Sequence, residues 1–386
     1  MVEYFTHDLI NSLIYFQIVI LVFIISNIII IHRARGHTTT NIFPMVSILV
    51  PARNEERNIA HCVQSLLALD YPSFEVLVLD DQSSDNTRPI LEKISTSNPQ
   101  LKVLEGEPPP ENQVGKNWAC SQLARQAQGD LLFFTDADTF HKPETLKTIV
   151  TALIGERADL LTGFPHQEVK TWGERLLVPF FNWALYCFIP LILAYRFRLP
   201  LLSGSIGQMM LFRREAYLAV GGHDGVSFSI VDDLMLTRQI KAAGLRWRVV
   251  YITDLISCRM YQNYREAYKG FVKNLFAAFD FRLLPYVFVF IWLGIMFWLP
   301  LIVLMLTIIG QAPQAQLNAL IVCITLSVLL WLIPYSDMGI PFGLVFLYPG
   351  TILAFEWIAL QSLRHNIIGR LSWKERRLPR SRLKWL

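Results

Sequence analysis

Three groups of aspartates in this sequence have the residue types and spacing of a ligand-binding or catalytic site. They are Asp80-Asp81, Asp136 with Asp138, and Asp232-Asp233. The first two groups follow apolar runs (74–79 and 131–134) that are typical of buried strands, and the third opens a predicted helix. Carboxylates at the edge of a parallel sheet suit Mg²⁺ or Mn²⁺ shared with substrate phosphates. Taken alone, Asp-x-Asp also fits a strand-to-loop turn with two solvated acids.

The elements that must position these acids alternate between strand and helix. Apolar runs predict strands at 45–50, 74–79, 101–104, 131–134, 209–212 and 247–251. Apolar spacing and cap residues predict helices at 55–69, from 87 onwards, and at 118–127, 214–220 and 232–243. The alternation predicts an α/β fold with a mostly parallel, Rossmann-like sheet, whose strand ends bring the acids to one edge.

The composition indicates a membrane protein, since 53% of the 386 residues are hydrophobic and the mean hydropathy is +0.37. Residues 9–31 and 285–309 are long and apolar enough to cross a bilayer. A cleaved signal peptide fits 9–31 less well, because no basic residues precede the run and no small-residue cleavage site follows it. Two weaker candidate spans lie at 320–333 and 344–360.

The charges beside these segments predict their orientation. Two acids precede the first segment and two arginines, Arg33 and Arg35, follow it, so we expect an outer N-terminus and a cytoplasmic domain at the plasma membrane. The tail from 362 carries eight Lys or Arg and one acid, which suits the cytoplasmic face. The domain and the basic tail can both be cytoplasmic only if the chain crosses the membrane an even number of times between them. We therefore expect two, with one weaker candidate re-entrant or interfacial.

Four parts are expected along the chain: a membrane anchor at 1–36, a domain at 44–283, a membrane region at 284–362 and a basic cytoplasmic tail at 363–386, with a linker at 38–41. Residues 175–198 are also long enough to span, but a span there would separate Asp138 from Asp232 by the membrane. Internal prolines and flanking arginines predict an interfacial helix on the cytoplasmic leaflet instead. A buried core helix is the alternative.

The remaining composition narrows the class of protein. The five cysteines are scattered, odd in number and never in a Cys-x-x-Cys pair, which fits a reducing compartment and argues against a disulfide framework. The sequence contains neither a zinc-ligand spacing nor an aromatic-basic module, so nothing in it supports nucleic-acid binding.

The motifs of this chain resemble those of the family 2 glycosyltransferases, which have the GT-A fold. They are Val46–Glu56 (VSILVPARNEE), Val78–Thr87 (VLDDQSSDNT), Gly115-Lys116, Asp136-Ala137-Asp138, Gly207–Arg214 (GQMMLFRR), Gly221-Gly222 and Val231–Leu236 (VDDLML). Their order matches the family over roughly 44–274. The resemblance implies an inverting sugar transfer from a nucleotide-sugar, such as a UDP-hexose, with Mg²⁺ or Mn²⁺ as cofactor.

The resemblance also implies roles for single residues. It places in the substrate pocket Pro51, Arg53, Glu55, Asp81, Lys116, Asp136 and Gln208. Asp81 would accept a hydrogen bond from the base, and Asp138 would bind the metal together with Asp136. Asp233 would be the catalytic base, with Asp232 beside it. The alternative for Asp233 is a helix N-cap, a position where Asp is common.

Three departures from the family pattern bear on base binding and on the acceptor. Arg53 stands where an aromatic residue is usual, and its guanidinium can also lie flat on a base. Asp232 replaces the usual glutamate. Polysaccharide synthases carry Gln-x-x-Arg-Trp where this chain has Gln262–Glu266 (QNYRE), so the Trp is missing. The runs Arg259–Tyr261 and Lys269–Asn274 resemble instead the carotenoid- and hopanoid-associated branch, which implies addition of one sugar to a membrane lipid.

The chemistry of the reaction agrees with these assignments. A departing nucleoside diphosphate needs charge stabilisation, which a divalent ion supplies, and the attacking hydroxyl must lose its proton to a positioned carboxylate. Three alternatives stay open: a processive polysaccharide synthase, an inactive GT-A domain acting as a membrane scaffold, and a transporter. The transporter has least support, because the candidate spans contain almost no charged residue.

Overall fold

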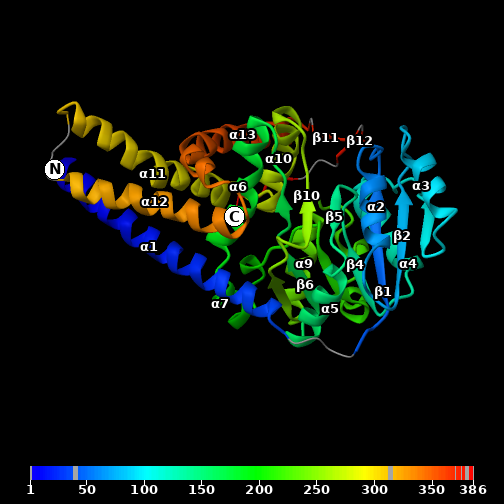
Figure 1. The fold of residues 1–386 in the computed structure, drawn as a ribbon. Coiled ribbons are helices and arrows are strands. Elements are labelled where there is room, and N and C mark those ends of the chain that lie inside the picture. Colours follow the sequence, from blue (N-terminus) through cyan, green and yellow to red (C-terminus); the bar gives the residue numbers. More distant parts are fainter. Residues whose placement is uncertain are drawn as a thin grey trace.

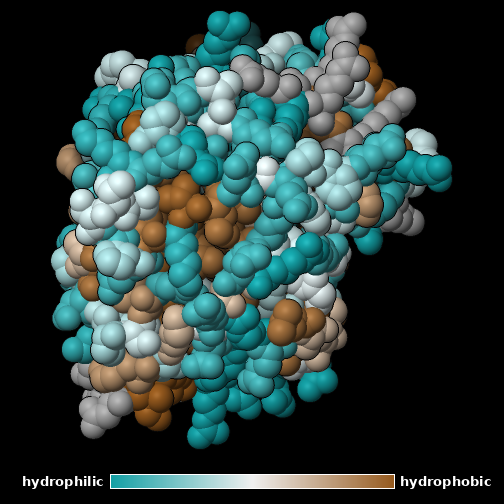
Figure 2. Space-filling view, turned by 90° about the vertical axis from the view of Figure 1, so that its right-hand side faces the viewer, coloured by the Kyte–Doolittle hydropathy of each residue, from teal (hydrophilic) through white to brown (hydrophobic). Residues whose placement is uncertain are grey.

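The computed structural model describes residues 2–37, 42–311, 316–369, 371–374, 376–378 and 382–385; the predicted linker at 38–41 and parts of the basic tail lie outside these ranges. An α/β domain lies at one end of an elongated group of helices (Figure 1). Figure 2 shows the face of this domain that points away from the long helices. This face is mainly hydrophilic, as expected for a surface in water.

A seven-stranded sheet forms the centre of the domain, in the order β3-β2-β1-β4-β8-β6-β9. Its strands are β1 (Val46–Ala52), β2 (Phe74–Asp80), β3 (Leu101–Glu105), β4 (Leu131–Phe134), β6 (Leu160–Gly163), β8 (Met210–Arg213) and β9 (Trp247–Val250). Only β8, among the described strands of this sheet, runs antiparallel to its neighbours. The predicted α/β fold with a mostly parallel sheet is thereby confirmed. β6 and a small second sheet of β5 (Thr139–His141), β7 (His166–Gln167) and β10 (Ile256–Cys258) were not predicted.

Helices cover both faces of the large sheet. They are α2 (Ile59–Leu67), α3 (Thr87–Ser95), α4 (Gly115–Gln126), α5 (Thr145–Gly155), α8 (Arg214–Ala219) and α9 (Asp232–Ala242). A further helix, α10 (Tyr264–Ala278), packs on other helices rather than on this sheet. Successive side chains of a strand point to opposite faces. Ile48 and Val50 of β1 accordingly belong to the core under α2 and α5, and Leu49 to the core shared with α4 and α9.

Among the described residues, four helices are long and apolar enough to cross a membrane: Asp8–Arg35 of α1 (Val2–Arg35), α11 (Leu283–Ile308), α12 (Leu317–Asp337), and Phe342–Ile368, which joins η4 (Phe342–Leu347) to α13 (Tyr348–Ile368). α12 is thus longer than the candidate at 320–333. Helices α1, α11 and α12 extend together away from the domain, whereas α13 stays beside it, against α10 and the helix α6 (Trp172–Phe188) (Figure 1). Gln17 of α1 turns inward and donates to Ser327 Oγ at 2.9 Å, as polar groups in membrane helices do.

The tail lies against the α/β domain, which bears on the number of crossings. The backbone N–H of Leu283 donates to Lys384 O at 2.8 Å, and Lys384 Nζ lies 2.8 Å from Asp280 Oδ2. A chain that leaves the domain at α11 and returns to it must cross a membrane an even number of times. The arrangement is compatible with the expected two crossings after the domain, whose number stays a prediction.

The segment 175–198 is not one interfacial helix. It forms α6 (Trp172–Phe188) and α7 (Leu191–Arg196), which are separated at Ile189-Pro190. Most of α6 is buried against α1, α10, α12 and α13. The burial of side chains such as Phe180, Trp183 and Tyr186 favours the buried-helix alternative for α6, and an interfacial position of this segment stays a prediction. Exposed apolar side chains such as Ile192 and Phe197 follow, and their contact with a membrane surface stays a prediction.

Trp183 fastens α6 to α12. Its side chain is fully buried, stacks on Trp331 with the ring centroids 4.0 Å apart, and donates from Nε1 to Leu330 O at 2.9 Å. We expect Trp183→Ala to destabilise the protein by about 3–5 kcal/mol and to lower its unfolding temperature in detergent. Leu193→Ala, at a position 38% exposed, is the control and should melt like the parent. Equal melting of all three proteins would contradict this role of Trp183.

Candidate active site

The three groups of aspartates meet at the carboxyl edge of the sheet, as their sequence positions predict. Asp81 follows β2, Asp136 and Asp138 follow β4, and Asp232 and Asp233 open α9. All five line one cavity of about 1410 Å³. Lining the same cavity are the other residues that the sequence singled out, namely Pro51, Arg53, Glu55, Lys116 and Gln208.

Asp80 has a different position from its neighbour. Its carboxylate accepts from the backbone N–H of Ser83 at 3.3 Å, its side chain is buried, and it does not line the cavity. Asp80 therefore shapes the turn after β2, and Asp81 is the acid of this pair that faces the cavity.

A lysine and a glycine lie at the centre of the acidic cluster. Lys116 Nζ, from the start of α4, is 2.7 Å from Asp136 Oδ1. The backbone N–H of Gly207 donates to Asp233 Oδ2 at 2.9 Å. A Cβ at Gly207 would stand 3.1 Å from Lys116 Nζ and 3.7 Å from oxygens of Asp136 and Asp233. A side chain at position 207 would therefore intrude between the ammonium group of Lys116 and the carboxylates of Asp136 and Asp233.

Asp232 and Asp233 have opposite electrostatic environments. Burial opposes the charge on Asp232, but Lys116 and His223 outweigh it and lower its pKa. Burial and the adjacent Asp232 raise the pKa of Asp233 to about 7. A carboxylate with a pKa near neutrality suits a general base. Since α9 begins at Asp232 and Val231 occupies the N-cap, the cap alternative for Asp233 is not what the structure has.

His223 is a residue of this cluster that the sequence reasoning missed. It is buried, its Nε2 lies 3.5 Å from Asp232 Oδ2, and its Nδ1 lies 2.8 Å from Tyr217 Oη. The one available signal was its position directly after Gly221-Gly222. The contact holds the Asp232 side chain in place at the start of α9.

Asp138 has the features expected of a cation ligand. Its Oδ1 is buried and has no hydrogen-bond partner among the described residues. Burial, followed by the charges of Asp136 and Glu55, raises its pKa to about 7. Within the described ranges no three His, Cys, Asp or Glu side chains gather around one point, so a bound ion would need ligands from the donor phosphates. Two carboxylates of this kind fit Mg²⁺ or Mn²⁺.

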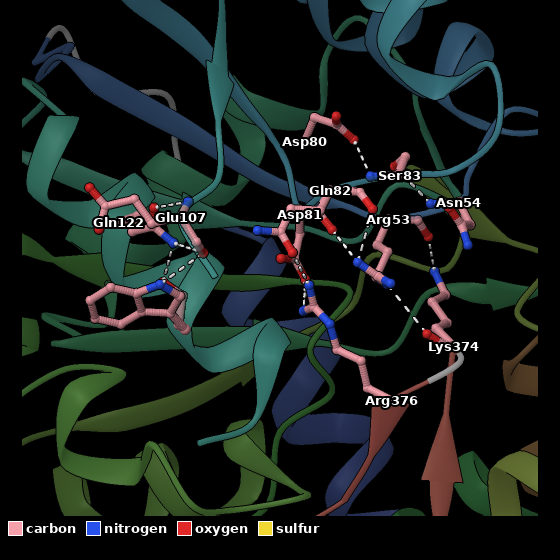
Figure 3. Close-up of polar contacts among 11 residues, drawn as sticks. Arg53, Asn54, Asp80, Asp81, Gln82, Ser83, Glu107, Gln122, Lys374 and Arg376 are labelled. Atoms are coloured by element: carbon pink, nitrogen blue, oxygen red, sulfur yellow. Dashed lines mark hydrogen bonds and ion pairs between the residues drawn. The ribbon is translucent and has the colours of Figure 1, made fainter. Parts of the chain in front are cut away.

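Backbone carbonyls hold Arg53 at the end of the cavity that Asp81 lines (Figure 3). Its Nη1 donates to Asp81 O at 2.6 Å and to Gln82 O at 3.0 Å, and its Nε donates to Lys374 O at 3.3 Å. Three contacts of this kind fix the plane of the guanidinium. Stacking of that plane on a base stays a prediction.

Two basic residues of the tail reach the same end of the cavity, and the sequence reasoning missed both (Figure 3). Arg376 Nη1 donates to Asp81 Oδ2 at 2.6 Å. Lys374 Nζ donates to Arg53 O at 2.8 Å and forms an ion pair with Glu55. No local signal could show these contacts, because the partners lie 295 or more positions apart and basic tails more often meet lipid head groups.

A buried glutamine and a group of apolar side chains line a further part of the cavity. Gln208 is buried, accepts from Gln167 Nε2 at 2.9 Å and donates to Cys258 Sγ at 2.9 Å, so its side chain is fixed. Apolar residues of α6 and α10 continue the lining, namely Phe181, Leu185, Phe271, Val272 and Leu275. Because α6 and α10 also pack on the membrane helices, this apolar part lies toward them.

Comparison with known proteins places this site in a family. A model described as glycosyl transferase family 2 matches residues 47–221. The chain carries a family 2 glycosyltransferase domain. The family expected from the motifs is thus confirmed. A mannosyltransferase from Pyrobaculum calidifontis, solved with GDP-mannose and Mn²⁺, aligns with 96% of this chain and 100% of its own at a TM-score of 0.51 and 17% identity. This likeness shows the GT-A fold.

Curated relatives match over part of their length. The chain is 30% identical over 227 residues to the beta-monoglucosyldiacylglycerol synthase of Synechocystis sp., covering 55% of this chain and 43% of the relative. It is 26% identical over 253 residues to the 4,4'-diaponeurosporenoate glycosyltransferase of Staphylococcus aureus, covering 63% of this chain and 64% of the relative. The chain therefore spans less than two thirds of the length of either relative.

Proposed function

We propose that this protein transfers a hexose from a UDP-linked donor to a hydroxyl or carboxyl group of a membrane lipid. The observation that carries the proposal is the single cavity of about 1410 Å³, which joins the five aspartates to the apolar residues of α6 and α10. A charged donor and an apolar acceptor can meet there without leaving the protein. The names of the two relatives, which give a diacylglycerol and diaponeurosporenoate as acceptors, support a lipid or carotenoid acceptor.

Asp233 is the proposed catalytic base. It takes the proton of the acceptor as the acceptor oxygen attacks the sugar carbon from the side opposite the diphosphate, so a single displacement inverts that carbon. Gly207 N–H orients the Asp233 carboxylate, and Asp232, held by His223, keeps Lys116 close to the reacting groups. Lys116 is placed to offset negative charge on the departing diphosphate.

Asp138 and Asp136 are the proposed ligands of a divalent cation, Mg²⁺ or Mn²⁺. The buried Oδ1 of Asp138, which has no hydrogen-bond partner in the described part of the chain, supports this proposal. Such an ion, when bound, supplies further charge stabilisation to the diphosphate leaving group. Pro51, Glu55 and Asp81 line the end of the cavity proposed for the nucleoside.

We further propose that the catalytic domain, residues 44–283, faces the cytoplasm at the plasma membrane. The arginines that follow the first span support this orientation. The tail contacts the domain and so lies on the same side of the membrane.

The proposal is tested with the full chain in lipid nanodiscs, Mn²⁺ and a panel of UDP-hexoses. Diacylglycerol, a carotenoid carboxylic acid and a soluble oligosaccharide are offered as acceptors. Mass spectrometry is expected to show one added hexose on a lipid acceptor. A ladder of extended oligosaccharides would favour a polymer synthase instead, and the absence of any donor binding or turnover would contradict glycosyl transfer.

The pH dependence of turnover is a second test. Asp233 accepts a proton only when ionised, and burial together with Asp232 raises its pKa to about 7, against the lowering by Lys116. Turnover at saturating substrates is therefore expected to rise with pH and to level off above pH 7. A rate that falls, or stays constant, as pH rises from about 6 to 8 would contradict the assignment of the base.

A further inference from the structure

The tail hairpin (residues 371–374 and 376–378) forms a wall of the cavity at its nucleotide end. Its two short strands, β11 (Ser372–Trp373) and β12 (Arg376–Arg377), pair antiparallel. Lys374 in the connecting turn has a φ of +44°. Four residues of the hairpin line the same cavity as the aspartates, namely Leu371, Lys374, Arg376 and Leu378. A segment expected at the membrane surface thus lies in the site.

The guanidinium of Arg376 forms hydrogen bonds with the side chains of the two residues that follow β2. Its Nη1 donates to Asp81 Oδ2 at 2.6 Å and its Nη2 donates to Gln82 Oε1 at 2.9 Å (Figure 3). The side chains of Asp81 and Arg376 are 7% and 24% exposed. Because the pair lies mostly out of water, loss of the guanidinium would leave a buried carboxylate without its cation, which is costly.

Gly115 provides the space for this guanidinium. A Cβ at this position would stand 2.3 Å from Arg376 Nη1 and 3.2 Å from Asp81 Oδ2. Gly115 is the first residue of α4, where any residue can adopt the backbone conformation. The need for glycine here is therefore steric, and it concerns the seat of Arg376.

The pair leaves one oxygen of Asp81 for a ligand. Asp81 Oδ1 is buried and has no hydrogen-bond partner among the described residues. Burial is the largest influence on the pKa of Asp81, and it raises this pKa above its ordinary value. Arg376, and to a smaller extent Arg53, act against that rise, whereas the neighbouring Asp80 adds to it. A charged carboxylate only accepts hydrogen bonds, whereas a protonated carboxyl also donates one. Removal of Arg376 would therefore increase the protonated fraction of Asp81. A protonated Asp81 both donates and accepts hydrogen bonds, so it discriminates less between ligands.

From these contacts we infer that Arg376 is a specificity-determining positioning residue of the donor site, an inference that rests on the proposed function. It holds Asp81 as a charged acceptor, whose free Oδ1 binds the ring N–H on the recognition edge of the donor's base. Uracil presents a donor there, and cytosine presents an acceptor, which a charged carboxylate repels. The tail hairpin is then a part of the donor site.

Calorimetric titration of UDP and CDP into the full chain in nanodiscs with Mn²⁺, at several pH values, tests this role. Arg376→Ala is expected to weaken UDP binding by roughly tenfold at neutral pH. The loss should grow as pH falls, because the carboxyl without its cation protonates at a higher pH. The preference for UDP over CDP should narrow. Arg376→Lys keeps the positive charge but not the paired N–H donors of the guanidinium. Compared with Arg376→Ala, it should restore the pH profile of UDP binding and only part of the affinity for UDP.

Three further variants separate this role from a loss of folding. Gly115→Ala leaves Arg376 in the chain but displaces its guanidinium, so it should reproduce the loss of UDP affinity. In the double variant with Arg376→Ala the two losses should not add, because both act through one contact. Arg382→Ala removes an exposed charge from the same tail and should bind UDP like the parent.

Each contrary result has a definite meaning. Parent-like affinity, pH profile and base preference in Arg376→Ala would overturn the inference and leave the proposed glycosyl transfer standing. Tighter UDP binding in Arg376→Ala would also overturn it, because the hairpin would then obstruct the site. If the parent binds neither nucleotide, the proposed function fails and this inference fails with it.

Discussion

Replacing Asp233 by asparagine is expected to reduce turnover by about 10³-fold while donor affinity changes little. The amide has nearly the shape of the carboxylate and can keep the contact with Gly207 N–H at 2.9 Å, but it cannot take a proton. The measurement is the initial rate of lipid glycosylation by the full chain, with UDP-sugar affinity from calorimetry. A helix-stabilising role alone would be worth only about 0.3–1 kcal/mol and would not touch the rate in this way.

Asp130→Asn is the matched control for this variant. Asp130 is exposed and directly precedes β4, so the same chemical change is made outside the cavity. The control should keep the turnover and the melting temperature of the parent. A turnover of Asp233→Asn within tenfold of the parent, with the fold intact, would remove Asp233 from the proposed role.

Asp138→Asn is expected to reduce turnover at least about 100-fold and to abolish the effect of Mn²⁺ on donor binding. Oδ1 of Asp138 is buried without a partner among the described residues, and loss of its charge removes the strongest attraction for a cation at that point. Titration of UDP with and without Mn²⁺ measures the effect directly. The parent should bind UDP more tightly with Mn²⁺, and the variant equally with and without it.

The same titrations decide whether the reaction depends on a metal at all. A parent that turns over at full rate in excess chelator would contradict the proposed cation site, whatever the variant does. Unchanged melting of Asp138→Asn without metal would show that the substitution acts on the site and not on the fold. A melting temperature above that of the parent would have the same meaning, because burial disfavours the carboxylate that the substitution removes.

The sequence was informative wherever position along a strand decides position in space. The buried runs before Asp81 and Asp136 predicted strands, and parallel strand ends meet at one edge. The meeting of these acids with Asp233 in one cavity was therefore predictable from a single chain. Strand direction was not, because the apolar run that became β8 has no pattern that distinguishes an antiparallel neighbour.

Packing partners were the part that local patterns could not supply. An apolar helix such as α6 suits a lipid interface and a protein core equally well, and its burial depends on Trp331 and other residues of later helices. The contacts of Arg53 and of Arg376 likewise depend on a chain segment about 300 positions away. A guanidinium that could lie flat on a base turned out to be held by backbone carbonyls.

The place of the tail hairpin in the chain also determines when the Asp81 end of the cavity is complete during synthesis. Asp81 leaves the ribosome early, but Arg376 is translated only after α11, α12 and α13. At usual rates of translation, the hundred residues between α10 and Arg376 take roughly 5–20 s. During that interval the nascent α/β domain has Asp81 without its cation. The Asp81 end of the cavity is thus completed only after α11, α12 and α13 have been made, so a chain that stalls before Arg376 lacks the contact between Arg376 and Asp81.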